Sequence, residues 1–133
     1  MYGLLDISTS GLVAQRTQID TISANIANSR TTRRADGEPG PYLRRVALLA
    51  PGDAKGGAGV HVEAIREDVN VLPRLVHDPS HPDANADGYV AYPNIDSSTE
   101  MINAMVAVRA YEANVTAMEA TKSMMAASLR LLA

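Results

Sequence analysis

The sequence predicts a mainly α-helical protein in which long N- and C-terminal helices pair as a coiled coil, with a small β insert between them. Three observations support this fold class. All seven prolines lie between Pro39 and Pro93, and seven of the nine glycines lie between Gly37 and Gly88. Residues 94–133 contain neither breaker. Five tyrosines stand beside no phenylalanine and no tryptophan, so the core must be built from aliphatic side chains and methionine, which line helix seams.

These shifts in composition divide the chain into two parts. Residues 1–35 and 94–133 are predicted to form one helical assembly domain that is discontinuous in sequence. Residues 36–93 form an insert that is rich in Pro and Gly and carries short strands. A chain of 133 residues has the size of one folding unit, so the insert is not expected to fold independently.

The N-terminal helix is predicted from apolar residues at seven-residue spacing. The residues that form this row, with Ile22 as an additional member, are Leu5, Leu12, Ile19, Ile22 and Ile26. An interior glycine costs about 1 kcal/mol relative to alanine, so Gly11 predicts a helix that is broken or ragged near its start. Asn28 is predicted to end the helix in a left-handed conformation.

The insert shows short apolar segments with the lengths of strands. Residues 42–49 have this length, and residues 53–59 form a Gly-rich turn that leads to residues 60–64, where apolar and polar side chains alternate. Residues 74–77 and 89–92 are further candidates for strands. The pattern predicts a small hairpin-like unit between the two helices.

The C-terminal helix is predicted to begin near Ser97. Ser97 and Glu100 have the spacing of a capping box, with Asp96 as a competing cap. Two rows at seven-residue spacing follow, and nine of their ten members are apolar or aromatic: Met101, Val108, Val115, Lys122 and Leu129, then Ala104, Tyr111, Met118, Met125 and Leu132. At about 1.5 Å per residue this seam spans roughly 50 Å.

A seam of this length is too long for one chain to cover. Ordering the backbone costs about 1–2 kcal/mol per residue, so a helix with an open seam is marginal on its own. One N-terminal helix covers only one side of the seam, which predicts completion of the core by neighbouring copies. The predicted subunit interface consists of the apolar row members Leu5, Leu12, Ile19, Ile22, Ile26, Met101, Val108, Tyr111, Val115, Met118, Met125, Leu129 and Leu132.

Composition argues against several function classes. The absence of cysteine excludes disulfides, thiolate nucleophiles and cysteine zinc sites. The net charge of −3 argues against nucleic-acid binding, and the local arginine cluster, Arg30, Arg33, Arg34, Arg44 and Arg45, has only Tyr42 for base stacking. The sequence shows neither a secretory leader nor a stretch for membrane insertion. No catalytic, cofactor-binding or metal-binding residues are predicted, and an enzyme is not expected.

Two alternatives stay open at this stage. A small metal- or calcium-binding module could use oxygen and nitrogen ligands of the 77–88 loop, namely His77, His81, Asp83, Asn85 and Asp87. Pro79 and Pro82 exclude a helix that would align the two histidines, and Asn94 stands where a calcium loop needs a bidentate glutamate. The other alternative is a self-contained helical domain that forms a coiled-coil oligomer with an unrelated partner.

Four stretches resemble a known family almost from end to end. They read DISTSGL and ANIAN in residues 6–28, GPYLRR in residues 40–45, HPDAN, GYV and PNI in residues 81–95, and EM, RAYEANV and KSM in residues 100–124. The chain thereby resembles the flagellar axial proteins of the rod and hook group, and within it the proteins of the proximal basal-body rod. Leu43, in place of a basic residue, and residues 29–34 depart locally from the pattern.

This resemblance implies a structural subunit of the flagellar basal-body rod. It implies terminal helices that pair and stack with those of neighbours around the export channel. The implied partners are other rod subunits, copies of the same chain, and basal-body ring and export-gate components. The implied location is the periplasmic rod, reached through the flagellar type III apparatus without a cleaved signal peptide.

Overall fold

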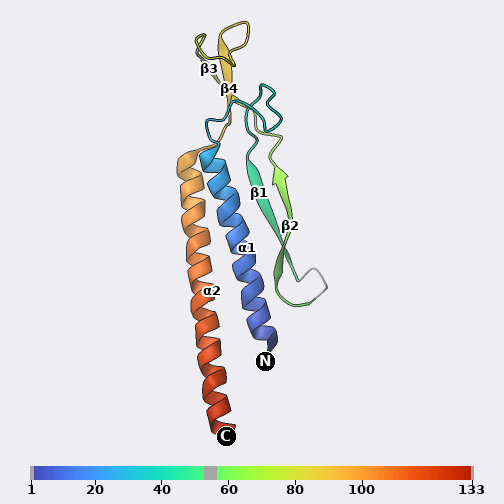
Figure 1. The fold of residues 1–133 in the computed structure, drawn as a ribbon, viewed down its shortest axis with the longest axis vertical. Coiled ribbons are helices and arrows are strands. Elements are labelled where there is room, and N and C mark those ends of the chain that lie inside the picture. The colour runs from blue at the N-terminus through green and yellow to red at the C-terminus, as the bar shows by residue number, and fades with distance from the viewer. Residues whose placement is uncertain (1, 53–56, 133) are drawn as a thin grey trace.

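The computed structural model describes residues 2–52 and 57–132, and it consists of two long helices and two antiparallel strand pairs (Figure 1). Helix α1 spans Tyr2–Ala27 and helix α2 spans Ser97–Leu132. The helices pack side by side and run in opposite directions, so that both chain ends lie at the same end of the molecule (Figure 1). The prediction of two terminal helices with a small β insert between them is confirmed.

Helix α1 is continuous through Gly11, so the predicted break near its start is wrong. Gly11 lies where α2 comes closest, because a Cβ atom at this position would lie 2.9 Å from the Nδ2 atom of Asn114. The glycine therefore permits close contact between the helices, and the packing offsets its weak helix propensity.

The end of α1 also differs from the prediction. No described residue other than glycine has a positive φ, so Asn28 does not adopt the left-handed conformation. Its side chain completes the helix end instead: Nδ2 donates to the carbonyl oxygen of Ala24 at 2.8 Å, and Oδ1 accepts from the Thr31 hydroxyl at 3.1 Å. The Ala24 carbonyl also accepts from the backbone N–H of Asn28 at 3.0 Å, so the side-chain bonds reinforce the last turn of the helix.

Helix α2 begins at the predicted residue, and of the two predicted caps the structure uses the competing one, Asp96. Asp96 accepts from the backbone N–H of Ser98 at 3.0 Å and from the hydroxyl of Thr99 at 2.6 Å. These hydrogen bonds, the one from Thr99 foremost, lower the pKa of the Asp96 carboxyl below its ordinary value. The capping-box interpretation of Ser97 and Glu100 is therefore wrong, and Glu100 is free for another contact.

The insert forms two separate strand pairs. Strands β1, Arg45–Pro51, and β2, Val60–Glu67, pair with a bulge between Leu48 and Leu49. They pack along α1, on the side away from α2 (Figure 1). Strands β3, Arg74–His77, and β4, Tyr89–Tyr92, form the second pair, beyond the start of α2 (Figure 1). All four predicted strand positions are confirmed, with the first strand starting three residues late; residues 53–56 of the predicted turn lie outside the described part.

The buried core is narrow. Among the described residues, the buried apolar side chains are Ala14, Val90, Pro93 and Ala107, and the buried polar ones are Thr21, Asn25 and Glu100. The interior between the helices is thus lined by small and polar groups. Most of the large apolar residues of α2 are exposed instead, and their position defines the candidate interface.

Candidate assembly interface

A buried polar cluster joins α1, β1 and α2 at one end of the helix pair. Glu100 is only 2% exposed, and its Oε1 atom pairs with the Arg44 guanidinium at 2.6 Å. Its Oε2 atom accepts from Nδ2 of Asn25 at 3.0 Å. A carboxylate removed from water needs such charge-assisted partners, and Glu100 has one on each side.

Asn25 extends this cluster into the first residue of β1. Its Nδ2 donates to the Arg45 carbonyl at 2.8 Å, and its Oδ1 accepts from the Arg45 backbone N–H at 2.8 Å. The Tyr42 hydroxyl donates to the same Oδ1 at 3.2 Å. Burial raises the pKa of Tyr42 above its ordinary value of 10.0, and the nearby Arg45 opposes the shift. One asparagine thus fixes the hairpin to the helix pair.

Two further polar contacts fix the other end of α1. Asn114 of α2 donates to the side-chain oxygen of Gln15 at 3.0 Å, beside the close approach at Gly11. The Ser10 hydroxyl accepts from the backbone N–H of Val60 at 3.1 Å and donates to the Ile7 carbonyl at 2.7 Å. Within the described residues every buried side-chain nitrogen and oxygen has a hydrogen-bond partner. The buried polar side chains of the helix pair are therefore satisfied inside one chain.

The face of α2 that packs on α1 can be identified from the spacing of its less exposed residues. Its less exposed residues recur every three or four positions: Glu100, Ala104, Ala107, Tyr111, Asn114, Met118, Thr121 and Met125. This stripe contains one of the two predicted apolar rows. The other row lies one position further along the helix, and its members Met101, Val108 and Leu129 are exposed, so α1 covers only one side of the apolar surface of α2.

The predicted interface residues fall into three groups. The five α1 residues, Leu5, Leu12, Ile19, Ile22 and Ile26, are all partly exposed, as are Tyr111, Val115, Met118 and Met125 of α2. Three α2 residues are exposed: Met101, Val108 and Leu129. The side chain of Leu132 lies outside the described part of the structure.

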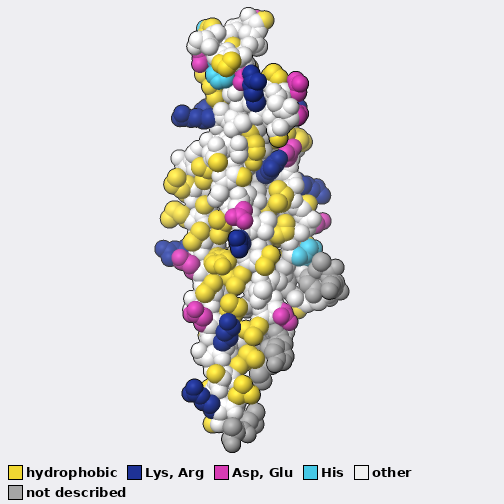
Figure 2. All heavy atoms as spheres, viewed as in Figure 1, with side chains coloured by type: hydrophobic (Ala, Val, Ile, Leu, Met, Phe, Trp, Pro, Cys, Tyr) yellow, Lys and Arg dark blue, Asp and Glu magenta, His cyan; other side chains and the backbone are white. Residues whose placement is uncertain are grey.

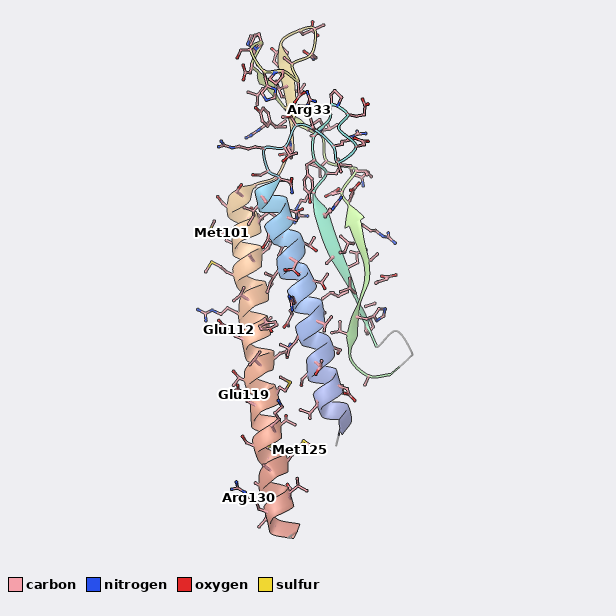
Figure 3. All side chains as sticks on the ribbon, viewed as in Figure 1. Arg33, Met101, Glu112, Glu119, Met125 and Arg130 are labelled. Atoms are coloured by element: carbon pink, nitrogen blue, oxygen red, sulfur yellow. The ribbon has the colours of Figure 1, made fainter. Side chains whose placement is uncertain are left out.

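Helix α2 carries more exposed apolar surface than the sequence rows contain. Besides the three residues named above, its exposed large apolar side chains are Ile102, Met105, Val106, Met124 and Leu131. Apolar side chains run over the helices to the free end of α2 (Figure 2). Met101 projects from α2 away from α1, whereas Met125 points to the side of α1 (Figure 3). An exposed apolar surface of this extent is typical of an interaction site.

A groove borders this surface. It has a volume of about 290 Å³ and lies between α1, the start of β1 and α2, where its apolar lining includes Ile22, Val46, Ala47, Val106 and Ala110. Val106 thus belongs both to the groove and to the exposed surface of α2. The groove gives the apolar surface a concave part, which suits the ridge of a neighbouring helix.

The 77–88 loop uses its polar groups for its own structure. Asp83 pairs with Arg33 at 2.6 Å and accepts from the Thr32 hydroxyl at 2.8 Å, and these bonds lower the pKa of its carboxyl. Asn85 Oδ1 accepts from the backbone N–H groups of Asp87 and Tyr89. No cluster of three or more His, Cys, Asp or Glu that could hold a metal occurs among the described residues. The metal-module alternative finds no support in this geometry.

The arginine cluster has structural partners too. Arg33 pairs with Asp83, Arg44 with Glu100, and Arg45 with Glu67 at 3.1 Å. Three of the five basic groups are thus neutralised by carboxylates of the same chain, which leaves little of the positive surface that nucleic acid would require. Over residues 2–52 and 57–132, neither helix combines the length and apolar character of a membrane span.

Sequence reasoning missed the residues that fix the elements together. The sequence pattern assigns Glu100 to a helix cap and Arg44 to a basic cluster, and it includes Asn25 and Asn114 only in stretches that resemble the family. A usable signal existed for Glu100, because a single carboxylate on an otherwise apolar helix face needs a buried cation. The identity of that cation could not be read from the pattern.

Comparisons with known proteins agree with this architecture. Residues 5–33 match the family model described as "Flagella basal body rod protein", and residues 86–131 match "Flagellar basal body rod FlgEFG protein C-terminal". The flagellar basal-body rod protein FlgC of Bacillus subtilis is 42% identical, over 96% of this chain and 95% of its own length. FlgC of Borreliella burgdorferi is 38% identical over 99% and 97%, and FlgC of Salmonella typhimurium is 37% identical over 98% and 97%.

Proposed function

The chain belongs to the family of the flagellar basal-body rod protein FlgC, and from this premise we propose how it takes its place in a rod. It is a structural subunit of the bacterial flagellar basal-body rod and not an enzyme. Its contribution to motility is mechanical. What has to be explained is therefore how one subunit holds the next.

The proposal is that α2 supplies the principal contact between subunits. It is supported by one observation above all: α2 packs on α1 along one stripe and leaves a second apolar stripe open, which includes Met101, Val108 and Leu129. In the assembled rod the terminal helices would pack as coiled coils, with the open stripe of one subunit against helices of the next. The thirteen apolar row residues would then be shared between the intrachain and intersubunit seams.

The wider setting follows from the same family membership. Other rod subunits and further copies of this chain are the proposed neighbours, with basal-body ring and export-gate components at the borders of the rod. The proposed location is the periplasmic, proximal part of the rod. Export through the flagellar type III apparatus without a cleaved leader is part of this proposal.

A charge in the open stripe tests the proposal. Val108 is 39% exposed, so Val108→Asp should leave the fold of the single chain intact, because the carboxylate can reach water. It should prevent rod assembly, because a buried unpaired charge at an interface is strongly unfavourable. Motility and the amount of the chain in isolated basal bodies are the measurements.

Ile65→Asp is the matched control, since Ile65 is 52% exposed but lies on β2, outside the helices. This variant should still assemble. Deleting residues 115–133 should abolish assembly completely. Motile cells with normal flagella carrying Val108→Asp would contradict the proposed role of α2.

A further inference from the structure

Sulfur chemistry in this chain is confined to methionine. The sequence contains no cysteine, and five of its six methionines lie within the bounds of α2: Met101, Met105, Met118, Met124 and Met125. Peroxides oxidise a methionine thioether to a sulfoxide, which turns a flexible apolar side chain into a polar one. Apart from Met1, every sulfur atom of the chain therefore lies on the helix that carries the candidate interface.

The five methionines of α2 divide by their exposure to solvent. Met101, Met105 and Met124 are 57%, 62% and 70% exposed. Met118 and Met125 are partly buried and belong to the stripe of α2 that packs on α1. The side chains of Met101 and Met125 show the contrast, since the first projects away from α1 and the second points to its side (Figure 3). A dissolved oxidant thus reaches three of the thioethers freely and the other two only in part.

The exposed methionines lie among the apolar residues that the proposed function buries. Met101 and Met105 are four positions apart, on neighbouring turns of α2, and the exposed Ile102 and Val106 each follow one of them directly. A sulfoxide at these positions is hydrated while the subunit is free, so the single chain should tolerate it. In an apolar contact with a neighbouring helix, its oxygen would lose this water without gaining a donor, which is unfavourable.

We propose that Met101, Met105 and Met124 form a reversible oxidation site, and that peroxide converts an unassembled subunit into a form that is excluded from the rod. In each step the thioether sulfur gives two electrons to hydrogen peroxide and takes up one oxygen atom. The O–O bond of the peroxide breaks, the sulfur–oxygen bond of the sulfoxide forms, and one water molecule leaves. The inference rests on the proposed function, because it takes the exposed surface of α2 as the surface that neighbouring subunits cover.

Reversal of the oxidation requires a reductant from outside the chain. Methionine sulfoxide reductases restore the thioether with a dithiol as the reductant. The sulfoxide oxygen leaves as water with the two thiol protons, and the dithiol becomes a disulfide. This chain has no cysteine, so it neither supplies the thiols nor is trapped in a disulfide. An oxidised free subunit can therefore be repaired, whereas thioethers that are buried in an assembled rod are shielded from the oxidant.

The first test uses the purified full-length chain and dilute hydrogen peroxide. Peptide mass spectrometry follows the gain of one oxygen atom at each methionine with time. Met101, Met105 and Met124 should each oxidise several times faster than Met118 or Met125, because α1 partly covers the second pair. The helical circular-dichroism signal should stay constant while the exposed positions react. Equal rates at exposed and partly buried positions would overturn the selectivity on which the site depends.

The second test measures assembly by competition inside one cell. Cells make two full-length chains together, the natural chain and a variant with Met101→Leu, Met105→Leu and Met124→Leu, which stays apolar but has no thioether at these positions. After a short exposure to hydrogen peroxide, the ratio of variant to natural chain in newly formed basal bodies should rise about tenfold, the effect of burying one polar group without a partner. General damage by peroxide cancels in this ratio, because both chains share the cell.

A variant with Met118→Leu and Met125→Leu is the matched control. It carries the same kind of substitution on the same helix, but on the stripe that packs on α1. In competition with the natural chain, its ratio should not respond to peroxide. Both chains of this pair keep the three exposed thioethers and should lose incorporation equally.

The outcomes separate the inference from the proposed function. If peroxide oxidises the three exposed methionines of the free chain but leaves the ratio of the first pair unchanged, the oxidation site is overturned and the rod role stands. An equal rise in the ratios of both pairs would also overturn it, since the exposed thioethers would then not be the cause. If the natural chain does not enter basal bodies even without peroxide, the proposed function fails and the inference fails with it.

Discussion

Helices α1 and α2 lie side by side in one chain, yet they use their surfaces differently. Helix α1 is packed on two sides, by α2 and by the β1–β2 hairpin, and its polar residues Ser10, Gln15 and Asn25 all bond to other elements. Helix α2 is packed on one side, and most of its large apolar residues are exposed. The difference supports the proposal that hydrogen bonds orient the parts of the subunit, whereas the exposed apolar surface of α2 serves contacts with neighbouring subunits.

The contrast also explains why so thin a core holds three elements together. Neutral and charged hydrogen bonds contribute about 0.5–3 kcal/mol each when the alternative is an unpaired buried group. Hydrogen bonds are directional, so the contacts of Asn25 and Glu100 fix how α1, β1 and α2 lie relative to one another. Apolar contacts between helices alone would allow one helix to shift along the other. These hydrogen bonds fix the orientation of α1, β1 and α2 relative to one another. The outer face of α2 is not needed for that purpose.

The largest effect on the free energy of unfolding is expected at Glu100, the buried carboxylate that bonds to Arg44 and Asn25. Glu100→Ala leaves Arg44 without its partner and Asn25 with an open donor, so the free energy of unfolding should fall by about 3 kcal/mol. Denaturant unfolding of the full chain measures it. Glu112→Ala, which breaks only the exposed pair with Arg109, is the control and should cost less than about 1 kcal/mol. Equal effects would show that the cluster is not what orients α1.

A smaller effect is expected where the helices come closest. Gly11→Ala gains about 1 kcal/mol of helix propensity but forces Asn114 away from Gln15, so the single change should be nearly neutral or slightly destabilising. In an Asn114→Ala background the obstacle is gone, and Gly11→Ala should stabilise the chain by about 1 kcal/mol. A double-mutant cycle of unfolding free energies measures the coupling; strictly additive effects would contradict the close approach.

The stability of the folded chain should depend on pH through Asp83, which lies in the insert. Hydrogen bonds from Arg33 and Thr32 hold the pKa of Asp83 below its ordinary value of 3.8 in the folded chain. Stability from this group is therefore present above that value and is lost as the pH falls through the lower, folded pKa. Between about pH 5 and about pH 2, the melting temperature of Asp83→Asn should fall less steeply than that of the natural chain. Parallel curves would rule out a contribution of this pair.

The smallest effect on folding is expected on the open face of α2. Val106→Ser and Ile102→Ser remove exposed apolar groups, so each should change the unfolding free energy by less than about 0.5 kcal/mol. Their incorporation into basal bodies should nevertheless fall. If either variant destabilised the single chain as much as Glu100→Ala, the open face would not be reserved for neighbours.

The sequence predicts the elements better than their contacts. Breaker residues and seven-residue spacing predict both helices, and short apolar segments of strand length, one of them with alternation, predict the strands, because these signals are local. The face of α2 that meets α1 was not predictable, because two apolar rows compete and the chosen stripe contains Glu100, Ala107 and Asn114 between apolar residues. Gly11 illustrates the same limit: propensity predicts a break, whereas a contact with a residue far along the chain decides the outcome.

The pairing of distant segments has a consequence for the order in which the molecule forms. Asn25 and Glu100 are 75 positions apart, and Gln15 and Asn114 are 99 apart. During translation α1 leaves the ribosome long before the segment that completes its seam has been made. Closing such long loops is entropically costly and slows folding. The helix pair therefore cannot close until α2 has been synthesised at least as far as Asn114, so α1 stays without its partner helix for most of translation.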